Sequence, residues 1–176
     1  MKRFTAIATA IALSASAASA FSFIDNVTRD YVDPNYYPID ASVFAGGGGR
    51  TTIVGTTRDG ASAEEIAANI RLPSFLSQRT VRAATEPQKG LHMVLVFAPQ
   101  SGTTPRKACS GQAKGGQAGD TLKVMGVFCS GSGKPLSEAL YTANGSPVPS
   151  DPDFQRRMSI LIKTILPVRN PETQGD

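Results

Sequence analysis

The sequence predicts an α+β protein of two layers, in which two helices cover one face of a mostly antiparallel sheet of about four strands. Two observations lead to this fold class. Short β-branched or apolar runs, bounded by glycine and proline, recur between residues 51 and 142. Two segments with a helical spacing of apolar residues lie among and after these runs, which gives the element order β-α-β-β-β-α.

The first strand and the first helix are predicted before Pro73. Residues 51–57 are rich in β-branched side chains and form a short strand. Ser62 and Glu65 have the spacing of a capping box, in which each side chain satisfies a backbone N–H at the start of a helix. We therefore expect a helix from this point to Pro73, where proline ends it. Residues 80–84 are a candidate for a further short strand.

The strongest strand pattern is found at residues 92–98, which are apolar on both faces and therefore belong in the middle of the sheet. A long polar loop follows at residues 99–120. Residues 121–129 and the more exposed residues 136–142 then form two strands of a hairpin, joined by a glycine-containing turn at residues 130–135.

The last predicted helix begins at residues 150–153, where a capping side chain, a proline and acidic residues follow one another. It ends at Pro167. Arg156, Arg157 and Lys163 lie off its apolar stripe. The stripe consists of Phe154, Met158, Leu161, Ile162 and Ile165.

The first twenty residues have the pattern of a secretory signal peptide. Lys2 and Arg3 precede a short apolar run, and residues 18–20 match a cleavage site of the A-x-A type. We expect cleavage after Ala20 and a periplasmic protein. The domain organisation then has four parts, namely the signal peptide 1–20, an extended aromatic arm with a glycine-rich hinge 21–49, a single α+β domain 50–167 and a polar tail 168–176.

The composition excludes several classes of function. Without Lys2 and Arg3, sixteen basic and fourteen acidic residues remain, and this surplus of two positive charges gives no strong attraction to nucleic acid. After Ala20 no segment approaches the roughly 18 apolar residues that a membrane-spanning helix needs. We therefore expect neither nucleic-acid binding nor a transmembrane segment after cleavage, and the oligomeric state stays open.

Cys109 and Cys129 are the two cysteines of the chain. An even number in an exported protein favours a disulfide bond. A redox-active pair is the alternative, but the cysteines of such pairs usually lie close together at a helix N-terminus. A structural bridge closing a loop of about 20 residues stabilises a fold by roughly 3 kcal/mol.

Three motifs fall short of a catalytic or metal site. Residues 131–134 resemble a phosphate-binding loop, but Phe128 and Pro135 occupy the positions where that loop needs a glycine and a hydroxyl residue. His92, the one histidine, has no nucleophile motif to act on and is expected to be partly exposed at the end of a strand. Residues 46–49 favour a flexible connector over an anion cradle. We therefore assign no catalytic, cofactor-binding or metal-binding residue.

Arg106, Lys107 and Lys114 make the long loop around Cys109 basic. A long loop that is fixed by a disulfide is a common place for binding function. These three residues are the candidate contacts for an envelope protein partner, and a merely solvated loop is the alternative.

Several stretches together resemble a group of small exported or lipid-anchored envelope proteins of proteobacteria that have no established activity. They are the signal peptide and residues 93–97, 127–129, 134–138 and 151–167, and the resemblance covers roughly residues 50–167. Some relatives carry a cysteine for lipid attachment, which this chain lacks. The resemblance implies an α+β envelope protein and brings no catalytic residues.

We expect a non-enzymatic periplasmic accessory or binding protein of the bacterial envelope, without a cofactor. One alternative is a protein that binds a small ligand in a pocket between the aromatic arm and the sheet. Another is an enzyme with a carboxylate- or thiol-based site that the sequence does not reveal.

Overall fold

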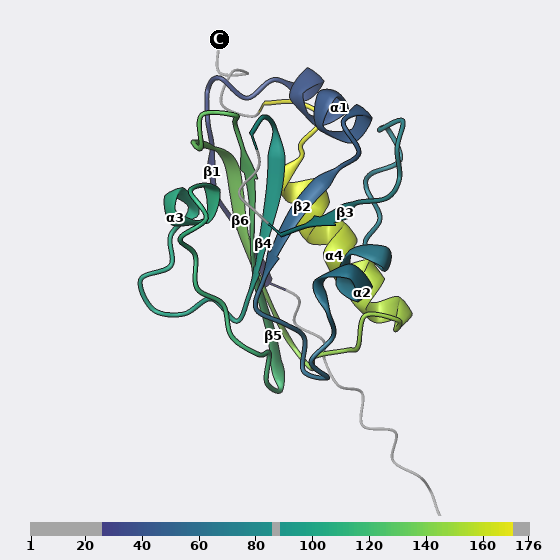
Figure 1. Cartoon of the computed structure of the whole chain (residues 1–176). Coiled ribbons are helices and arrows are strands. Elements are labelled where there is room, and N and C mark those ends of the chain that lie inside the picture. Colours follow the sequence, from purple (N-terminus) through teal and green to yellow (C-terminus); the bar gives the residue numbers. More distant parts are fainter. Residues whose placement is uncertain (1–25, 86–88, 171–176) are drawn as a thin grey trace, which may run out of the picture.

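A computed structural model describes residues 26–85 and 89–170 (Figure 1). In this part of the chain, six strands form one sheet in the order β1-β6-β5-β4-β2-β3, accompanied by four helices. The predicted signal peptide and residues 171–176 of the predicted tail lie outside the described residues. In chain order the elements are β1 (Asn26–Val32), α1 (Pro38–Gly46), β2 (Arg50–Val54), α2 (Ala63–Ala68), β3 (Arg82–Ala84), β4 (His92–Phe97), α3 (Pro105–Cys109), β5 (Thr121–Cys129), β6 (Pro135–Asn144) and α4 (Pro152–Ile165).

The sheet is mixed, so the prediction of a mostly antiparallel sheet of about four strands is wrong. β2 pairs in parallel with both β3 and β4, whereas β4, β5, β6 and β1 pair antiparallel in turn. The parallel pairing follows from α2, because a helical crossover between β2 and β3 returns the chain in the same direction. The edge strand β1 was not predicted, whereas β3 lies within residues 80–84, the candidate for a further short strand.

The helices cover both faces of the sheet, not one as predicted. α1, α2 and α4 bury their apolar side chains on the face to which Met93, Leu95 and Phe97 of β4 point. α3 packs on the opposite face, against Val94 and Val96 of the same strand (Figure 1). The alternation of β4 therefore supplies both cores, and its apolar residues from Met93 to Phe97 are buried as the sequence predicts.

Two local predictions are confirmed. The capping box at the start of α2 is formed, since Ser62 N donates to Glu65 Oε2 at 2.7 Å and Glu65 N donates to Ser62 Oγ at 3.2 Å. β5 and β6 form the expected antiparallel hairpin. However, α2 ends at Ala68, well before Pro73.

Residues 26–46 form regular structure, which corrects the prediction of an extended arm. β1 pairs along β6, and α1 packs on the sheet. The rings of Tyr36 and Phe44 stand edge-on to Phe128 of β5, with centroids 6.1 and 5.5 Å apart. These aromatic side chains build the core under α1, so the domain begins before the predicted boundary at residue 50.

The segment after α4 is anchored to the same region. Asn170 is 6% exposed, and its Nδ2 donates to the carbonyl oxygens of Asp33 and Tyr36 at 3.0 and 3.1 Å. The Tyr36 hydroxyl donates to the Pro167 carbonyl at 2.8 Å. Residues 168–170 thus belong to the domain and not to a polar tail.

We expect alkaline pH to destabilise this fold through Tyr36. Burial raises the pKa of its phenol above the ordinary value of 10.0, and the charge of Asp40 acts in the same direction. The unfolded chain releases this proton first, so the stabilisation is complete below about pH 10 and declines as the pH rises toward the folded-state pKa. Urea unfolding from about pH 8 to about pH 12 should show a steeper loss for the wild type than for Tyr36→Phe. An equal decrease in the free energy of unfolding with pH in both proteins would contradict this role of the Tyr36 phenol.

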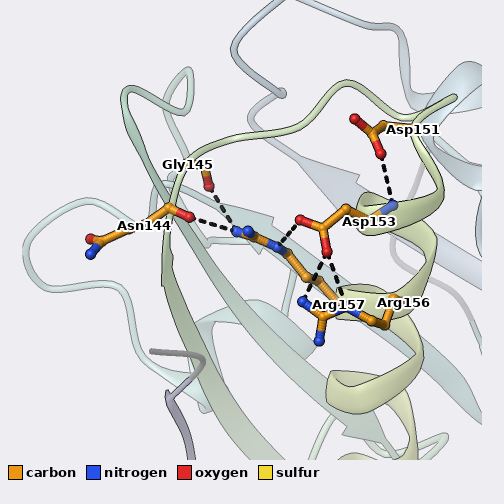
Figure 2. A network of polar contacts seen from close by, with 6 residues as sticks. All are labelled: Asn144, Gly145, Asp151, Asp153, Arg156 and Arg157. Carbon is orange, nitrogen blue, oxygen red and sulfur yellow. Dashed lines mark hydrogen bonds and ion pairs between the residues drawn. The ribbon is translucent and has the colours of Figure 1, made fainter. Parts of the chain in front are cut away.

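Arg157 is buried, although the sequence placed it off the apolar stripe of α4. Its side chain is 1% exposed, and its Nε lies 2.7 Å from Asp153 Oδ2. Its Nη1 donates to the carbonyl oxygens of Asn144 and Gly145 at 3.0 and 2.8 Å (Figure 2). The guanidinium therefore ties the first turns of α4 to the end of β6. A hydropathy pattern treats arginine as polar and does not anticipate a buried one that has its own partners.

Candidate ligand-binding site

A cavity opens where β3 ends. β3 pairs with β2 only from Arg50 to Thr52, whereas β2 continues beside β4 as far as Val54. Beyond Ala84, that edge of β2 has no strand partner among the described residues. A cavity of about 480 Å³ lies there, a size in the range of small-molecule pockets.

The walls of this cavity are mainly apolar. Glu64, near the start of α2, is the one Asp, Glu, Lys or Arg that lines the cavity among the residues whose structure is described. The apolar lining includes Ile53, Val54, Ala83, Ala84, Val94 and Ala108. An apolar cavity with few polar groups is typical of a site that binds a small organic molecule.

His92 lines the cavity from the first position of β4. It is 1% exposed, so the expectation of a partly exposed histidine is wrong. Its Nδ1 lies 2.9 Å from the carbonyl oxygen of Gly90. Because a carbonyl oxygen only accepts hydrogen bonds, Nδ1 carries the hydrogen of this bond. Nε2, the other ring nitrogen, is buried and has no hydrogen-bond partner within the described residues.

Thr52 adds a second polar atom to the same cavity. It pairs with Val94 across β2 and β4, so it shares the sheet face on which His92 and Val94 lie. Its Oγ1 is buried and, like His92 Nε2, has no partner in the described part of the chain. A buried polar atom left unpaired costs roughly 1–3 kcal/mol. Both atoms are covered by their neighbours, and the cavity itself, with its mainly apolar lining, is the feature of this fold that most favours a bound ligand.

The disulfide holds one wall of the cavity. Cys109 of α3 is bonded to Cys129 of β5, with the Cα atoms 5.6 Å apart, which confirms the predicted pair. Cys129 is the direct partner of His92 across β4 and β5. Ala108 and Gly111, which flank Cys109 in the chain, line the cavity. The bridge therefore fixes α3 against the part of the sheet that presents His92.

The three candidate partner-contact residues are exposed. Arg106 and Lys107 lie on α3, which interrupts the predicted loop, and Lys114 follows it. Lys107 Nζ donates to the Gly102 carbonyl at 2.7 Å, and the Lys114 carbonyl accepts from the Thr103 hydroxyl at 2.9 Å. None of the three lines the cavity in the described part of the chain, so contact with a partner stays a prediction.

Both glycine-rich motifs form turns of the backbone. The N–H groups of Gly47, Gly48 and Gly49 donate to carbonyl oxygens of α1, so this turn closes the helix and does not cradle an anion. Residues 131–134 form the turn between β5 and β6, in which Ser130 N donates to the Lys134 carbonyl.

Two classes of site are absent from residues 26–85 and 89–170. No group of three or more His, Cys, Asp or Glu side chains there could hold a metal ion. None of the helices in these ranges is long and apolar enough to cross a membrane.

Comparisons with known proteins were made at three levels. No family model matches the chain, and no curated protein matches it. No family is assigned. Among solved structures, two of the PelC dodecamer from Paraburkholderia phytofirmans, one of them a point variant, are similar to this chain at 17% and 16% sequence identity. Both give a TM-score of 0.38 and cover 84% of this chain and 99% or 100% of their own, a likeness too weak to support a conclusion.

Sequence reasoning missed the cavity because its polar atoms belong to ordinary strand residues. Thr52 stands in a β-branched run, where threonine is common. The sequence tests His92 only against a nucleophile motif, and that test does not bear on whether the residue lines a cavity. The one available signal was a histidine at the start of a strand that is otherwise apolar on both faces.

Proposed function

We propose that this chain is a small-ligand-binding protein of the bacterial envelope, with its ligand in the cavity at the end of β3. The observation that carries the proposal is the cavity of about 480 Å³, whose lining is mainly apolar and carries a few polar residues, among them His92 and Thr52. A cavity of this size and lining is typical of sites that bind small organic molecules. The envelope location rests on the signal-peptide pattern of residues 1–20 and on the disulfide, which is typical of oxidising compartments.

The cavity differs in place from the pocket that the sequence predicted between the aromatic arm and the sheet. Tyr36 and Phe44 pack directly against Phe128 of β5. The proposed ligand site lies elsewhere, beside β3 and α3.

Native mass spectrometry of the protein isolated gently from its own envelope fraction tests the proposal. We expect a bound small-molecule mass on the wild type and its loss in Ala84→Leu, because the larger side chain would occupy the cavity. Ala68→Leu is the matched control, since it makes the same change on an exposed position of α2 outside the cavity lining. An unliganded wild type, or an equal bound mass in both variants, would overturn the proposal.

A further inference from the structure

We infer that α1 docks on the surface of a membrane that contains anionic lipids, with its exposed apolar side chains at the lipid boundary and nearby basic side chains at the lipid phosphates. The inference is independent of the proposed ligand site, because none of the residues that carry it lines the cavity at the end of β3. It rests on the outer face of α1 and on the charges at the C-terminal end of this helix.

The outer face of α1 is apolar. Ile39 and Val43, one helical turn apart, are 64% and 57% exposed, and Tyr37, just before the helix, is 59% exposed. The one acidic residue of α1, Asp40, is half-buried and accepts a hydrogen bond from Tyr37 N at 3.1 Å. The other exposed positions of the helix are Pro38, Ser42 and Gly46. A helix that packs on a domain usually shows charged side chains to water, so this apolar outer face marks a contact surface.

A further exposed apolar side chain lies close to the start of α1. Val168 is 59% exposed and stands between Pro167 and Asn170, which are both hydrogen-bonded to Tyr36. These bonds hold the segment after α4 against the chain that leads into α1, and Figure 1 shows the two side by side. The four exposed side chains form the α1 patch, which consists of Tyr37, Ile39, Val43 and Val168.

Basic side chains gather at the C-terminal end of α1. Arg50 and Lys89 line a hollow of about 170 Å³ together with Val43, and neither Asp nor Glu lines this hollow among the described residues. Arg82 lies nearby, because a Cβ built on Gly48, in the turn that closes α1, would come within 3.8 Å of Arg82 Cδ. Positive charge beside exposed apolar side chains is typical of protein surfaces that bind anionic lipids.

The size and the charge of this surface favour a membrane over a second protein. A helix of nine residues is about 14 Å long and roughly 10 Å wide, whereas a stable protein interface buries about 800 Å² on each partner. A symmetric contact between two α1 patches would also bring the basic residues of both copies together, and these charges repel each other. A lipid surface instead offers phosphates to the basic side chains and an apolar layer to Ile39 and Val43. Tyrosine, as at Tyr37, is enriched at that boundary.

Tryptophan fluorescence tests the contact directly, because the chain contains no tryptophan. In the processed protein, Ile39→Trp places a reporter on the α1 patch, and Val148→Trp is the control at an exposed position before α4. With vesicles of phosphatidylglycerol and phosphatidylcholine, we expect the emission of Ile39→Trp to shift to shorter wavelength and that of Val148→Trp to stay unchanged. With vesicles of phosphatidylcholine alone, we expect a much smaller shift of Ile39→Trp, because the basic side chains then meet no anionic lipid.

Sedimentation with the same vesicles measures the contribution of each part of the surface. Ile39→Gln together with Val43→Gln should reduce binding about tenfold, because both changes remove apolar contact area. Lys89→Glu should also reduce binding, and added salt should weaken the binding of the wild type. Lys123→Glu is the matched control, since it makes the same change of charge at an exposed position of β5 on the sheet face opposite α1.

Three results would overturn the inference. The first is a wild type that does not sediment with vesicles containing phosphatidylglycerol. The second is an equal loss of binding in Lys89→Glu and Lys123→Glu, which would reduce the effect to the net charge of the protein. The third is a dimer in the absence of vesicles that dissociates in the variant with glutamine at positions 39 and 43, since a second copy would then cover the α1 patch.

Discussion

Arg157→Ala should lower the free energy of unfolding by about 3 kcal/mol, as measured by urea denaturation at neutral pH. The guanidinium is 1% exposed, and its removal leaves the carbonyl oxygens of Asn144 and Gly145 without this donor. Breaking a buried ion pair costs roughly 3–5 kcal/mol when the remaining charge stays buried. Here the remaining carboxylate, Asp153, is 35% exposed and water can solvate it, so we place the loss at the lower end of that range.

Arg156→Ala is the matched control for this prediction. Arg156 precedes Arg157 on α4 and pairs with the same carboxylate, since its Nη2 lies 2.8 Å from Asp153 Oδ1 (Figure 2). Its side chain is 47% exposed, and exposed ion pairs contribute at most about 1 kcal/mol. Similar losses in the two variants would mean that burial of Arg157 and its contacts with β6 contribute nothing.

The elements that the sequence predicts correctly are specified by short-range patterns. The capping box of Ser62 and Glu65 places the start of α2, and the alternation of β4 identifies a strand buried on both faces. The glycine turn between β5 and β6 predicts their hairpin. Each of these signals lies within about ten residues of chain, where backbone geometry and side-chain periodicity act directly.

The elements that the sequence misses depend on contacts that are distant in the chain. β1 lies mostly at an exposed edge and pairs with β6, more than a hundred residues later. The residues around Tyr36 and Phe44 show no clear helical or strand periodicity. Both rings pack against Phe128, which lies much later in the sequence, so no local pattern predicts this contact. Arg157 is another such case, since the carbonyl groups that accept its hydrogen bonds belong to Asn144 at the end of β6 and to Gly145 after it.

The candidate site also has one part that the sequence predicts and one part that it does not. Counting cysteines suffices to predict the bridge between Cys109 and Cys129, because the chain has only two. The cavity depends instead on where β3 stops relative to β2, and this follows from the sheet as a whole. No local pattern at Thr52 or His92 distinguishes a strand residue that lines a cavity from one that packs in a core.

Removing the disulfide with Cys109→Ala and Cys129→Ala together should lower the free energy of unfolding by about 3 kcal/mol. The two residues are 20 positions apart in the sequence. Without the bridge, the unfolded chain gains conformational entropy, and for a loop of that length this gain stabilises the unfolded state by roughly 3 kcal/mol. Urea denaturation against the oxidised wild type measures it. An unchanged free energy of unfolding would mean that the bridge raises the free energy of the folded state as much as that of the unfolded chain.

The same double variant should also lose affinity for the cavity ligand, and this effect is separable from stability. α3 carries the wall residue Ala108, and without the bridge it is held to β5 by packing alone. Arg157→Ala provides the comparison, because it should cost a similar free energy of unfolding, while Arg157, Asn144 and Gly145 are not among the residues that line the cavity. In dilute buffer both variants remain largely folded if the parent has an ordinary stability of about 5–15 kcal/mol. If only the cysteine variant loses the bound mass, the effect comes from the displacement of α3 at the cavity. If both variants lose it, the effect comes from global destabilisation, and α3 has no specific part in binding.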